Sequence, residues 1–192
     1  MPTIKSAQKP GEATARNGVN VAALFATIEA VKGNPAIAKF NFRAANSWLG
    51  GAKNRTTIQQ FSGALQEHRT AGPAFTADNG EAPVLLGDDQ APNPLEWLLH
   101  ALIGCMTTTI AYHAAALGIT VDAIDSELDG DIDLRGFLGL SEEAQKGYSA
   151  IRVRMRVKTQ AEPATIKALT AMSPMFDTVA RSVPLAVTVE TY

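Results

Sequence analysis

The spacing of apolar and polar residues predicts a chain that mixes helices and strands. Over residues 20–35, apolar side chains recur every three or four positions, as on a helix with one apolar face. Asn20 is suited to cap the start of this helix, and Pro35 is typical of a segment that follows its end. Residues 1–18 are polar and are expected to be loosely ordered. The pattern therefore predicts an N-terminal arm with one helix over residues 1–37.

Two later regions show the period of two that is typical of β-strands. Residues 38–64 alternate in this way on both sides of a glycine-containing turn, which predicts a hairpin. Residues 71–94 are rich in proline and glycine and predict a strand followed by a long loop. Residues 147–160 alternate cleanly and predict a strand with one buried face and one basic face. The side chains expected on the buried face are Ile151, Val153, Met155 and Val157.

A long helix with few charges is predicted between these strands. Asn93 suits its N-cap, Pro94 suits its first position, and Gly118 is typical of its end. No Asp, Glu, Lys or Arg occurs in the 25 residues from Trp97 to Val121, and a membrane span needs roughly 20 apolar residues. Polar residues interrupt this run and no arginine or lysine flanks it. A helix buried inside a protein is therefore favoured over a membrane span.

The C-terminal pattern completes a mixed fold. Residues 161–183 fit a helix, a break near Pro174 and a second helix, and residues 184–192 fit a strand. The predicted order is helix, strands, long helix, strands, helices, strand. This order indicates an α+β fold, with a mostly antiparallel sheet wrapped around the long central helix in one domain over residues 38–192.

Composition and charge narrow the classes of function. The net charge of -2 is spread without a block of like charge, which argues against a nucleic-acid partner. Cys105 is the only cysteine, so an intrachain disulfide is excluded and a reducing compartment fits. The N-terminus has no signal-peptide pattern. We therefore expect a cytoplasmic protein that binds neither nucleic acid nor membrane.

The thiol of Cys105 is the main candidate for chemistry, and it has an ordinary alternative. A free cysteine often behaves as a small buried apolar residue. A reactive cysteine needs its thiolate, which a neighbouring cation, a metal ion or a helix N-terminus favours. An unperturbed thiol has a pKa of about 8.5, and burial without a cation raises it further. Because Cys105 is expected about three turns inside its helix, such a cation has to come from elsewhere in the fold.

Metal-ligand patterns are weak in this chain. His68, His100 and His113 lack the spacing of a metal site. The acidic run DGDID, which begins at Asp129, suggests a calcium loop, but its sixth and twelfth positions hold leucine instead of glycine and glutamate. Alternating carboxylates on the exposed face of a strand explain the run, so neither a metal nor a cofactor is expected.

Residues 87–105, with the sequence GDDQAPNPLEWLLHALIGC, resemble the OsmC/Ohr family of cysteine-based hydroperoxide reductases. The matching features are the NPxE motif at residues 93–96, the apolar helix, and a cysteine eleven residues after the proline. The resemblance continues to the end of the chain and covers residues 38–192 in all. The N-terminal helix is an addition to the minimal family domain.

The resemblance implies an OsmC-like fold and an intertwined homodimer with two long helices buried at its centre. It implies that Cys105 is a peroxidatic thiol in an apolar pocket near the subunit interface. Its thiolate would attack the O–O bond of a small hydrophobic hydroperoxide and become a sulfenic acid. In the family, a second cysteine then closes a disulfide, and an external dithiol resets the enzyme. An arginine activates the first cysteine, and the motif glutamate, here Glu96, helps to hold that arginine.

The chain departs from this pattern at two places. Ser173 stands where the family has its second cysteine, and serine cannot form a disulfide. No arginine or lysine occurs over residues 70–134, and ungapped placement puts Leu85 or Leu86 near the activating position. A substitute cation would have to come from the partner chain or from an upstream arginine. The upstream candidates are Arg43, Arg55 and Arg69.

These observations leave two main hypotheses open. In the first, Cys105 works as a peroxiredoxin-like hydroperoxide reductase in oxidative-stress defence, and an external thiol resolves the sulfenic acid. In the second, the chain is a non-catalytic OsmC-like dimer that binds an apolar small molecule, since the resolving cysteine and the activating arginine are missing. A third reading is that Cys105 belongs simply to the core.

Overall fold

The computed structural model of the chain describes residues 15–181, whose contacts group them into two compact units. One unit contains residues 15–19 and 99–181, and the other contains residues 20–98. The domain boundary that the sequence pattern placed at residue 37 stays a prediction. The strand expected over residues 184–192 lies outside the described residues.

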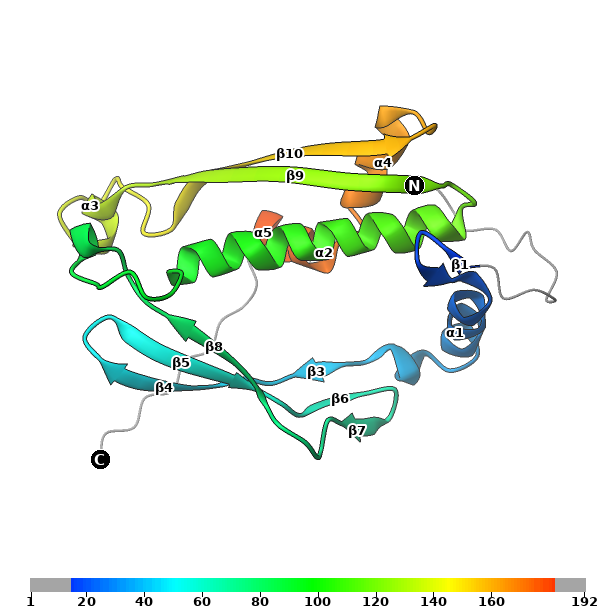
Figure 1. The fold of residues 1–192 in the computed structure, drawn as a ribbon, viewed down its shortest axis with the longest axis horizontal. Helices are drawn as coiled ribbons and strands as arrows, with labels where there is room; N and C mark the ends of the chain where they lie inside the picture. Colours follow the sequence, from blue (N-terminus) through cyan, green and yellow to red (C-terminus); the bar gives the residue numbers. More distant parts are fainter. Residues whose placement is uncertain (1–14, 182–192) are drawn as a thin grey trace. The chain divides into compact units, whose positions relative to one another are not determined.

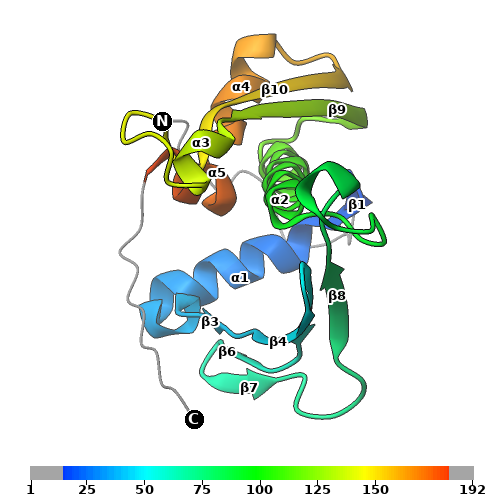
Figure 2. The ribbon, with the colours of Figure 1, turned by 90° about the vertical axis from the view of Figure 1, so that its left-hand side faces the viewer.

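The unit that carries Cys105 is built on one long helix and one long β-hairpin (Figures 1 and 2). Its elements are β1 (Ala15–Arg16), α2 (Pro94–Ala116, from residue 99 onward), β9 (Val121–Ile132), α3 (Leu134–Phe137), β10 (Tyr148–Thr159), α4 (Pro163–Thr170) and α5 (Pro174–Ala180). Strands β9 and β10 pair antiparallel over their whole length, from Tyr148 opposite Ile132 to Thr159 opposite Val121. Two of the predicted features, the helix break before Pro174 and the alternating strand at β10, are confirmed.

An apolar core joins the long helix to the hairpin and to α4. Ile110 and Ala114 of α2 are fully buried against Ile166 and Leu169 of α4. Side chains from the inner face of β9 and β10, including Met155, pack against this cluster. Burial of one such large aliphatic side chain stabilises the fold by about 1.5–3 kcal/mol. The core therefore fixes α4, and the turn that follows it, relative to α2.

Three expectations for this unit need correction. Val153, expected to point inward, is 37% exposed. Residues 15–18, expected to be loose, form β1 and a tight turn with β2 (Val19–Asn20), in which Asn17 and Gly18 both have positive φ. Helix α2 is not buried on all sides, because a stripe of its residues is exposed in the single chain. The stripe comprises Ala101, Gly104, Thr108 and Tyr112.

Both ends of α2 carry the caps that its sequence predicts. At its start, the Glu96 amide donates to Asn93 Oδ1 over 2.9 Å, and the Asn93 amide donates to Glu96 Oε2 over 2.8 Å. This reciprocal pair is a capping box, which satisfies two backbone donors at once. At its end, the amides of Gly118 and Ile119 donate to the carbonyls of Ala115 and Ala114. Gly118 has a φ of 78°, as this type of helix end requires.

The second unit consists of one helix, two short 3-10 turns and two three-stranded sheets. Its elements are β2 (Val19–Asn20, from residue 20 onward), α1 (Val21–Gly33), η1 (Pro35–Ala38), β3 (Asn41–Phe42), β4 (Ala45–Gly50), β5 (Lys53–Ile58), β6 (Phe61–Gly63), β7 (Gln66–His68), β8 (Phe75–Asn79) and η2 (Pro83–Leu85). The first turn of α2 also belongs to it. The sheet orders are β4-β5-β8 and β3-β6-β7, and every pair with a defined register is antiparallel.

The sequence pattern located most of this unit correctly. Asn20 caps α1 by accepting from the Ala23 amide over 3.0 Å, as predicted. The hairpin of β4 and β5 turns at the glycines predicted for it, and β8 is followed by a long loop. The pattern did not predict that β3 pairs with β6, a strand that begins 19 residues after it. The α+β fold with antiparallel sheets is confirmed.

Helix α2 is long and apolar enough to span a membrane, judged by length and composition alone. It is the one such helix among residues 15–181. The core helix of a soluble protein passes the same test, and α2 packs its buried face against the hairpin and α4. By itself the finding is weak evidence for a membrane protein.

Candidate active site

Cys105 lies in the middle of α2 with its side chain half-buried. Its neighbours on the helix differ in exposure: Met106 is buried, whereas Gly104 is exposed. The Cys105 carbonyl accepts a hydrogen bond from Thr109 Oγ1 over 2.8 Å. The sulfur therefore sits between the buried face of the helix and its exposed stripe, on a backbone that is regular helix.

The side chain that touches this sulfur is a serine. Ser173 Oγ donates a hydrogen bond to Cys105 Sγ over 3.2 Å, and Ser173 is fully buried. The structure thus brings together Cys105 and the residue that stands where the family has its second cysteine. The contact joins residues that are 68 positions apart in the chain.

The turn between α4 and α5 holds Ser173 in place. Ser173 is the N-cap residue of α5, and its Oγ accepts from the Phe176 amide over 3.3 Å. Its own amide donates to the Thr170 carbonyl at the end of α4 over 3.1 Å. Pro174 occupies the first position of α5, where a missing amide proton costs nothing. Since α4 is packed against α2, the serine is fixed on both sides.

Glu96 lies in the other unit, at the start of α2, and its carboxylate has a local structural partner. One carboxylate oxygen, Oε2, accepts from the Asn93 amide in the capping box. Asn93 Nδ2 also donates to Glu81 Oε2 over 3.4 Å. No arginine contact of Glu96 occurs among the described residues.

Two of the three candidate arginines are engaged by carboxylates of their own unit. Arg43 makes a two-bond contact with Glu67, at 3.1 and 2.7 Å, and this contact lowers the pKa of Glu67. Arg55 binds Asp78 in the same way, at 2.6 and 2.8 Å, and the hydrogen bonds lower the pKa of Asp78. Both carboxylates therefore stay ionised at neutral pH and satisfy these guanidinium groups.

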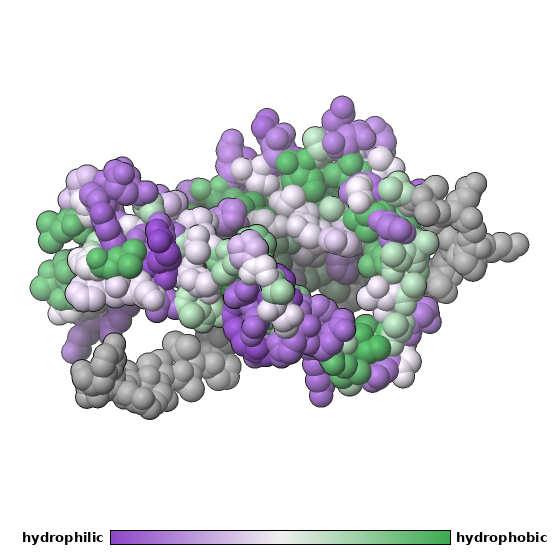
Figure 3. Space-filling view, turned by 60° about the horizontal axis from the view of Figure 1, so that its bottom comes forward, coloured by the Kyte–Doolittle hydropathy of each residue, from purple (hydrophilic) through white to green (hydrophobic). Residues whose placement is uncertain are grey.

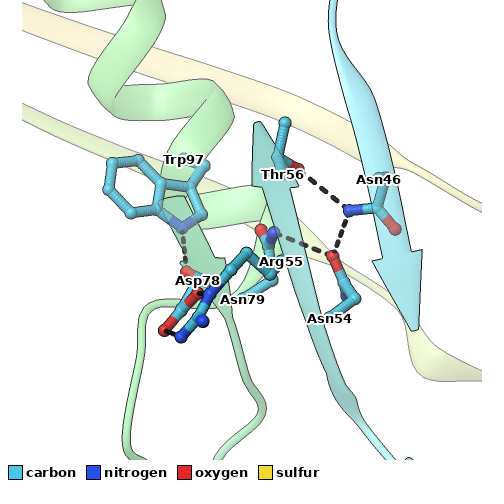
Figure 4. A network of polar contacts seen from close by, with 7 residues as sticks. All are labelled: Asn46, Asn54, Arg55, Thr56, Asp78, Asn79 and Trp97. Carbon is cyan, nitrogen blue, oxygen red and sulfur yellow. Dashed lines mark hydrogen bonds and ion pairs between the residues drawn. The ribbon is translucent and has the colours of Figure 1, made fainter. Parts of the chain in front are cut away.

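The Arg55–Asp78 pair belongs to a polar network on the β4-β5-β8 sheet (Figure 4). The indole of Trp97, in the first turn of α2, donates to the Asp78 carbonyl over 3.0 Å. Asn54 Oδ1 accepts from the amide groups of Asn46 and Asn79. The network ties the start of α2 to strand β8.

Arg69, the third candidate, lies against aromatic rings. Its guanidinium carbon is 4.9 Å from the centroid of the Phe61 ring and 5.5 Å from that of Phe75, within the range of cation–π contacts. Arg69 has an unusual positive φ of 51°. Leu86, at the position that ungapped placement suggested for the activating group, is 94% exposed, and Leu85 ends the short turn η2. Arg43, Arg55 and Arg69 all belong to residues 20–98, a different unit from Cys105.

Within residues 99–181, no arginine or lysine side chain hydrogen-bonds to the cysteine sulfur. Four arginines of this range pair instead with aspartates. These pairs are Arg135–Asp133, Arg152 with Asp129 and Asp131, Arg156–Asp125, and Arg181–Asp177. The two partners of Arg152 belong to the DGDID run and lie on β9, where both pair across the strands with this arginine, whereas the last residue of the run, Asp133, caps α3.

The histidines do not assemble a ligand set. His68 stacks on Phe61 with ring centroids 4.6 Å apart, and its Nε2 is 2.9 Å from the Gly63 carbonyl oxygen. His113 is half-buried on α2, and desolvation lowers its pKa from the usual 6.5. Among the described residues, no group of three or more His, Cys, Asp or Glu side chains is placed to hold a metal ion.

The resemblance implied that position 173 lies close to Cys105, because the family's second cysteine closes a disulfide there, but it assigned no role to the hydroxyl of Ser173. The Ser-Pro dipeptide at residues 173–174 is a signal for the start of a helix, so the capping role of the hydroxyl was open to inference. The hydrogen bond to Cys105 was not, because its geometry depends on how α4 packs against α2. Chemically, the arrangement offers a half-exposed sulfur with one buried hydroxyl donor.

Comparison with known proteins agrees with this architecture. The family model described as OsmC-like protein matches residues 87–188, just over half of the chain. A search of curated proteins found no match. The solved structures found include an OsmC-like protein from Mycoplasma pneumoniae, at 14% identity and a TM-score of 0.56, over 74% of this chain and 89% of that one.

Two further solved structures have lower TM-scores. An OsmC-like protein of unknown function from Vibrio cholerae is 13% identical, with a TM-score of 0.51, over 74% of this chain and 93% of that one. An organic hydroperoxide resistance protein from Legionella pneumophila is 14% identical over 72% and 88%, with a TM-score of 0.46, too low to bear on the fold. At these identities the first two likenesses concern the fold alone. Together with the family match over residues 87–188, they lead to one conclusion: the chain belongs to the OsmC-like family.

Proposed function

We propose that this protein reduces organic hydroperoxides through Cys105 and that an external thiol restores the enzyme. The observation that carries the proposal is the hydrogen bond from buried Ser173 to a half-exposed sulfur. A cysteine that served only as core would not need a polar partner. Membership in the OsmC-like family supports the same chemistry.

The reaction needs only the thiolate, the peroxide and thiols. The Cys105 thiolate attacks one peroxide oxygen, the O–O bond breaks, and the other oxygen leaves with a proton as an alcohol. The sulfur, now a sulfenic acid, has lost two electrons to the peroxide. One external thiol attacks it and releases water, which leaves a mixed disulfide. A second external thiol then attacks this disulfide, regenerates Cys105 and departs as an oxidised thiol pair.

The external thiol is required because the chain has no second cysteine. Ser173 cannot close a disulfide, although its oxygen is in contact with the sulfur. We expect small hydrophobic hydroperoxides as substrates, because the surroundings of Cys105 on α2 are largely apolar. The proposed setting is oxidative-stress defence in the cytoplasm.

We also expect a homodimer in solution. The exposed aromatic residues of the unit of residues 20–98 leave apolar surface in contact with water in the single chain, and patches of apolar residues are visible on the face drawn in Figure 3. Phe42 and Trp48 are the extreme aromatic cases, 71% and 75% exposed. Extended apolar surface on a soluble protein usually marks an interface. Light scattering on the full chain should give twice the monomer mass, and a monomer at all concentrations would contradict this expectation.

A second candidate is a non-catalytic dimer that binds an apolar small molecule. The observation in its favour is that no cation hydrogen-bonds to the sulfur within residues 99–181, so the thiolate lacks the partner that usually activates it. In this case Cys105 and Ser173 would line a binding surface and take no part in chemistry.

Consumption of tert-butyl hydroperoxide with dithiothreitol as reductant separates the two candidates. The wild-type protein should consume peroxide in proportion to protein, and Cys105→Ser should abolish consumption. Thr27→Ser, an exposed change on α1 in the other unit, is the control and should retain activity. Trapping with dimedone followed by mass spectrometry should find the sulfenic acid on Cys105. A folded wild-type protein that consumes no peroxide with several thiols would overturn the proposed activity.

A further inference from the structure

The buried hydroxyl of Ser173 makes two hydrogen bonds, one as an acceptor and one as a donor. Its oxygen accepts from the Phe176 amide over 3.3 Å and donates to Cys105 Sγ over 3.2 Å. Ser173 is 0% exposed, whereas the sulfur that it contacts is half-exposed. A serine whose role was only to cap α5 would need the first bond and not the second.

The protonation state of the sulfur sets the direction of the bond. The Phe176 amide is a donor and occupies one lone pair of the serine oxygen, which leaves the hydroxyl proton free to point to the sulfur. A thiolate has no proton and can only accept, so the hydroxyl is the donor whenever Cys105 is ionised. Hydrogen bonds to an ionised acceptor are about twice as strong as those between neutral groups. The hydroxyl therefore stabilises the thiolate more than the thiol.

Helices α4 and α5 hold Ser173 in position next to the sulfur. Ser173 links the end of α4 to the start of α5, and α4 is packed through Leu169 and Ile166 against α2. The serine oxygen cannot move away without the loss of the α5 cap. It therefore stays beside the sulfur as a donor that is in place before the reaction begins.

We propose that Ser173 is a positioning residue for Cys105. The O–H of Ser173 donates a hydrogen bond first to the thiolate and then to the sulfenate. The catalytic meaning of this inference rests on the proposed function. When the sulfur takes an oxygen from the peroxide, the same O–H donates to the new sulfenate and no atom of the serine is exchanged. The residue that replaced the second thiol would thus stabilise the reactive sulfur and leave its resolution to an external thiol.

The pH profile of Cys105 alkylation by iodoacetamide tests the proposal without peroxide. Ser173→Ala should lower the alkylation rate at neutral pH about tenfold and move the profile to higher pH, because one charge-assisted hydrogen bond is lost. Ser173→Thr keeps the hydroxyl and should restore most of the wild-type rate. Thermal unfolding of each variant shows whether the fold is intact.

If Ser173→Ala fails to fold, Ser173→Gly takes its place, since glycine at an N-cap costs only a few tenths of a kcal/mol relative to serine. An unchanged alkylation profile in a folded Ala or Gly variant would overturn the proposal. A slower rate that Thr does not restore would point to packing and would overturn it as well.

The peroxide assay keeps this result separate from the proposed function. A Ser173-dependent profile in a protein that consumes no peroxide would retain the positioning role and reject the reductase. Peroxide consumption together with an alkylation profile that does not depend on Ser173 would retain the reductase and reject the positioning role.

Discussion

The two units of this chain are stabilised by different means. The unit with Cys105 has an apolar core in which Ile110, Ala114 and Leu169 are almost completely inaccessible. In the unit of residues 20–98, Val21 is the one large apolar side chain that is buried, and the contacts of the unit are strand pairing, exposed ion pairs and stacked rings. The first unit is therefore held by a buried core around α2 and α4, whereas the second keeps much of its apolar surface exposed in the single chain.

The core of the first unit offers the test with the largest expected effect. Ile110→Ala should lower the free energy of unfolding by about 2–5 kcal/mol, because it removes a fully buried side chain and leaves a cavity. Phe42→Ala is the matched change in the second unit and should cost less than about 1 kcal/mol at concentrations where the chain is monomeric. Urea unfolding measures both variants. A larger loss for Phe42→Ala than for Ile110→Ala would reverse the comparison.

The junction of the units, at the start of α2, gives an intermediate effect. Asn93→Ala removes the side chain that accepts from the Glu96 amide and should cost about 1 kcal/mol. Glu96→Gln should cost little, since glutamine can also fill this capping position. Thermal unfolding at constant pH measures both.

Glu96→Gln also tests whether Glu96 holds an activating arginine, as the resemblance implies. If that role exists, peroxide consumption should fall in Glu96→Gln while stability is retained, because a neutral amide pairs poorly with a guanidinium. Equal activity in Glu96→Gln and wild type would leave Glu96 with its capping role alone.

The sequence allowed prediction of features that depend on neighbouring residues. The caps of α2, the turn between β4 and β5 and the break before Pro174 all follow from residues within a few positions of each other. Features that join distant residues were not predicted. Arg43 pairs with Glu67, 24 positions away, and Arg55 with Asp78, 23 positions away, because strand pairing brings them together.

The candidate site shows the same difference between features set by neighbouring residues and features that join distant residues. The resemblance identified Cys105 and Ser173 as corresponding to the two family cysteines, which implied that they lie close together, but it did not predict a hydrogen bond between them. Their contact depends on the packing of α4 against α2, which is a property of the core and not of any local motif. A chemical role for the hydroxyl therefore became visible only in three dimensions.

His113 provides the smallest predicted effect, a dependence of stability on pH. Burial lowers the pKa of His113 in the folded chain below 6.5, its usual value in an unfolded chain. As pH falls through about 6.5, the unfolded chain binds a proton that the folded chain does not, so stability decreases until the pH drops below the folded pKa. His113→Gln should therefore flatten the slope of unfolding free energy against pH between about pH 7.5 and 5. Tyr112→Phe, the neighbouring change that leaves the His113 imidazole in place, should keep the wild-type slope. Parallel slopes for His113→Gln and wild type would mean that the proton uptake arises elsewhere, and that the desolvated face of α2 contributes nothing to the acid sensitivity of the first unit.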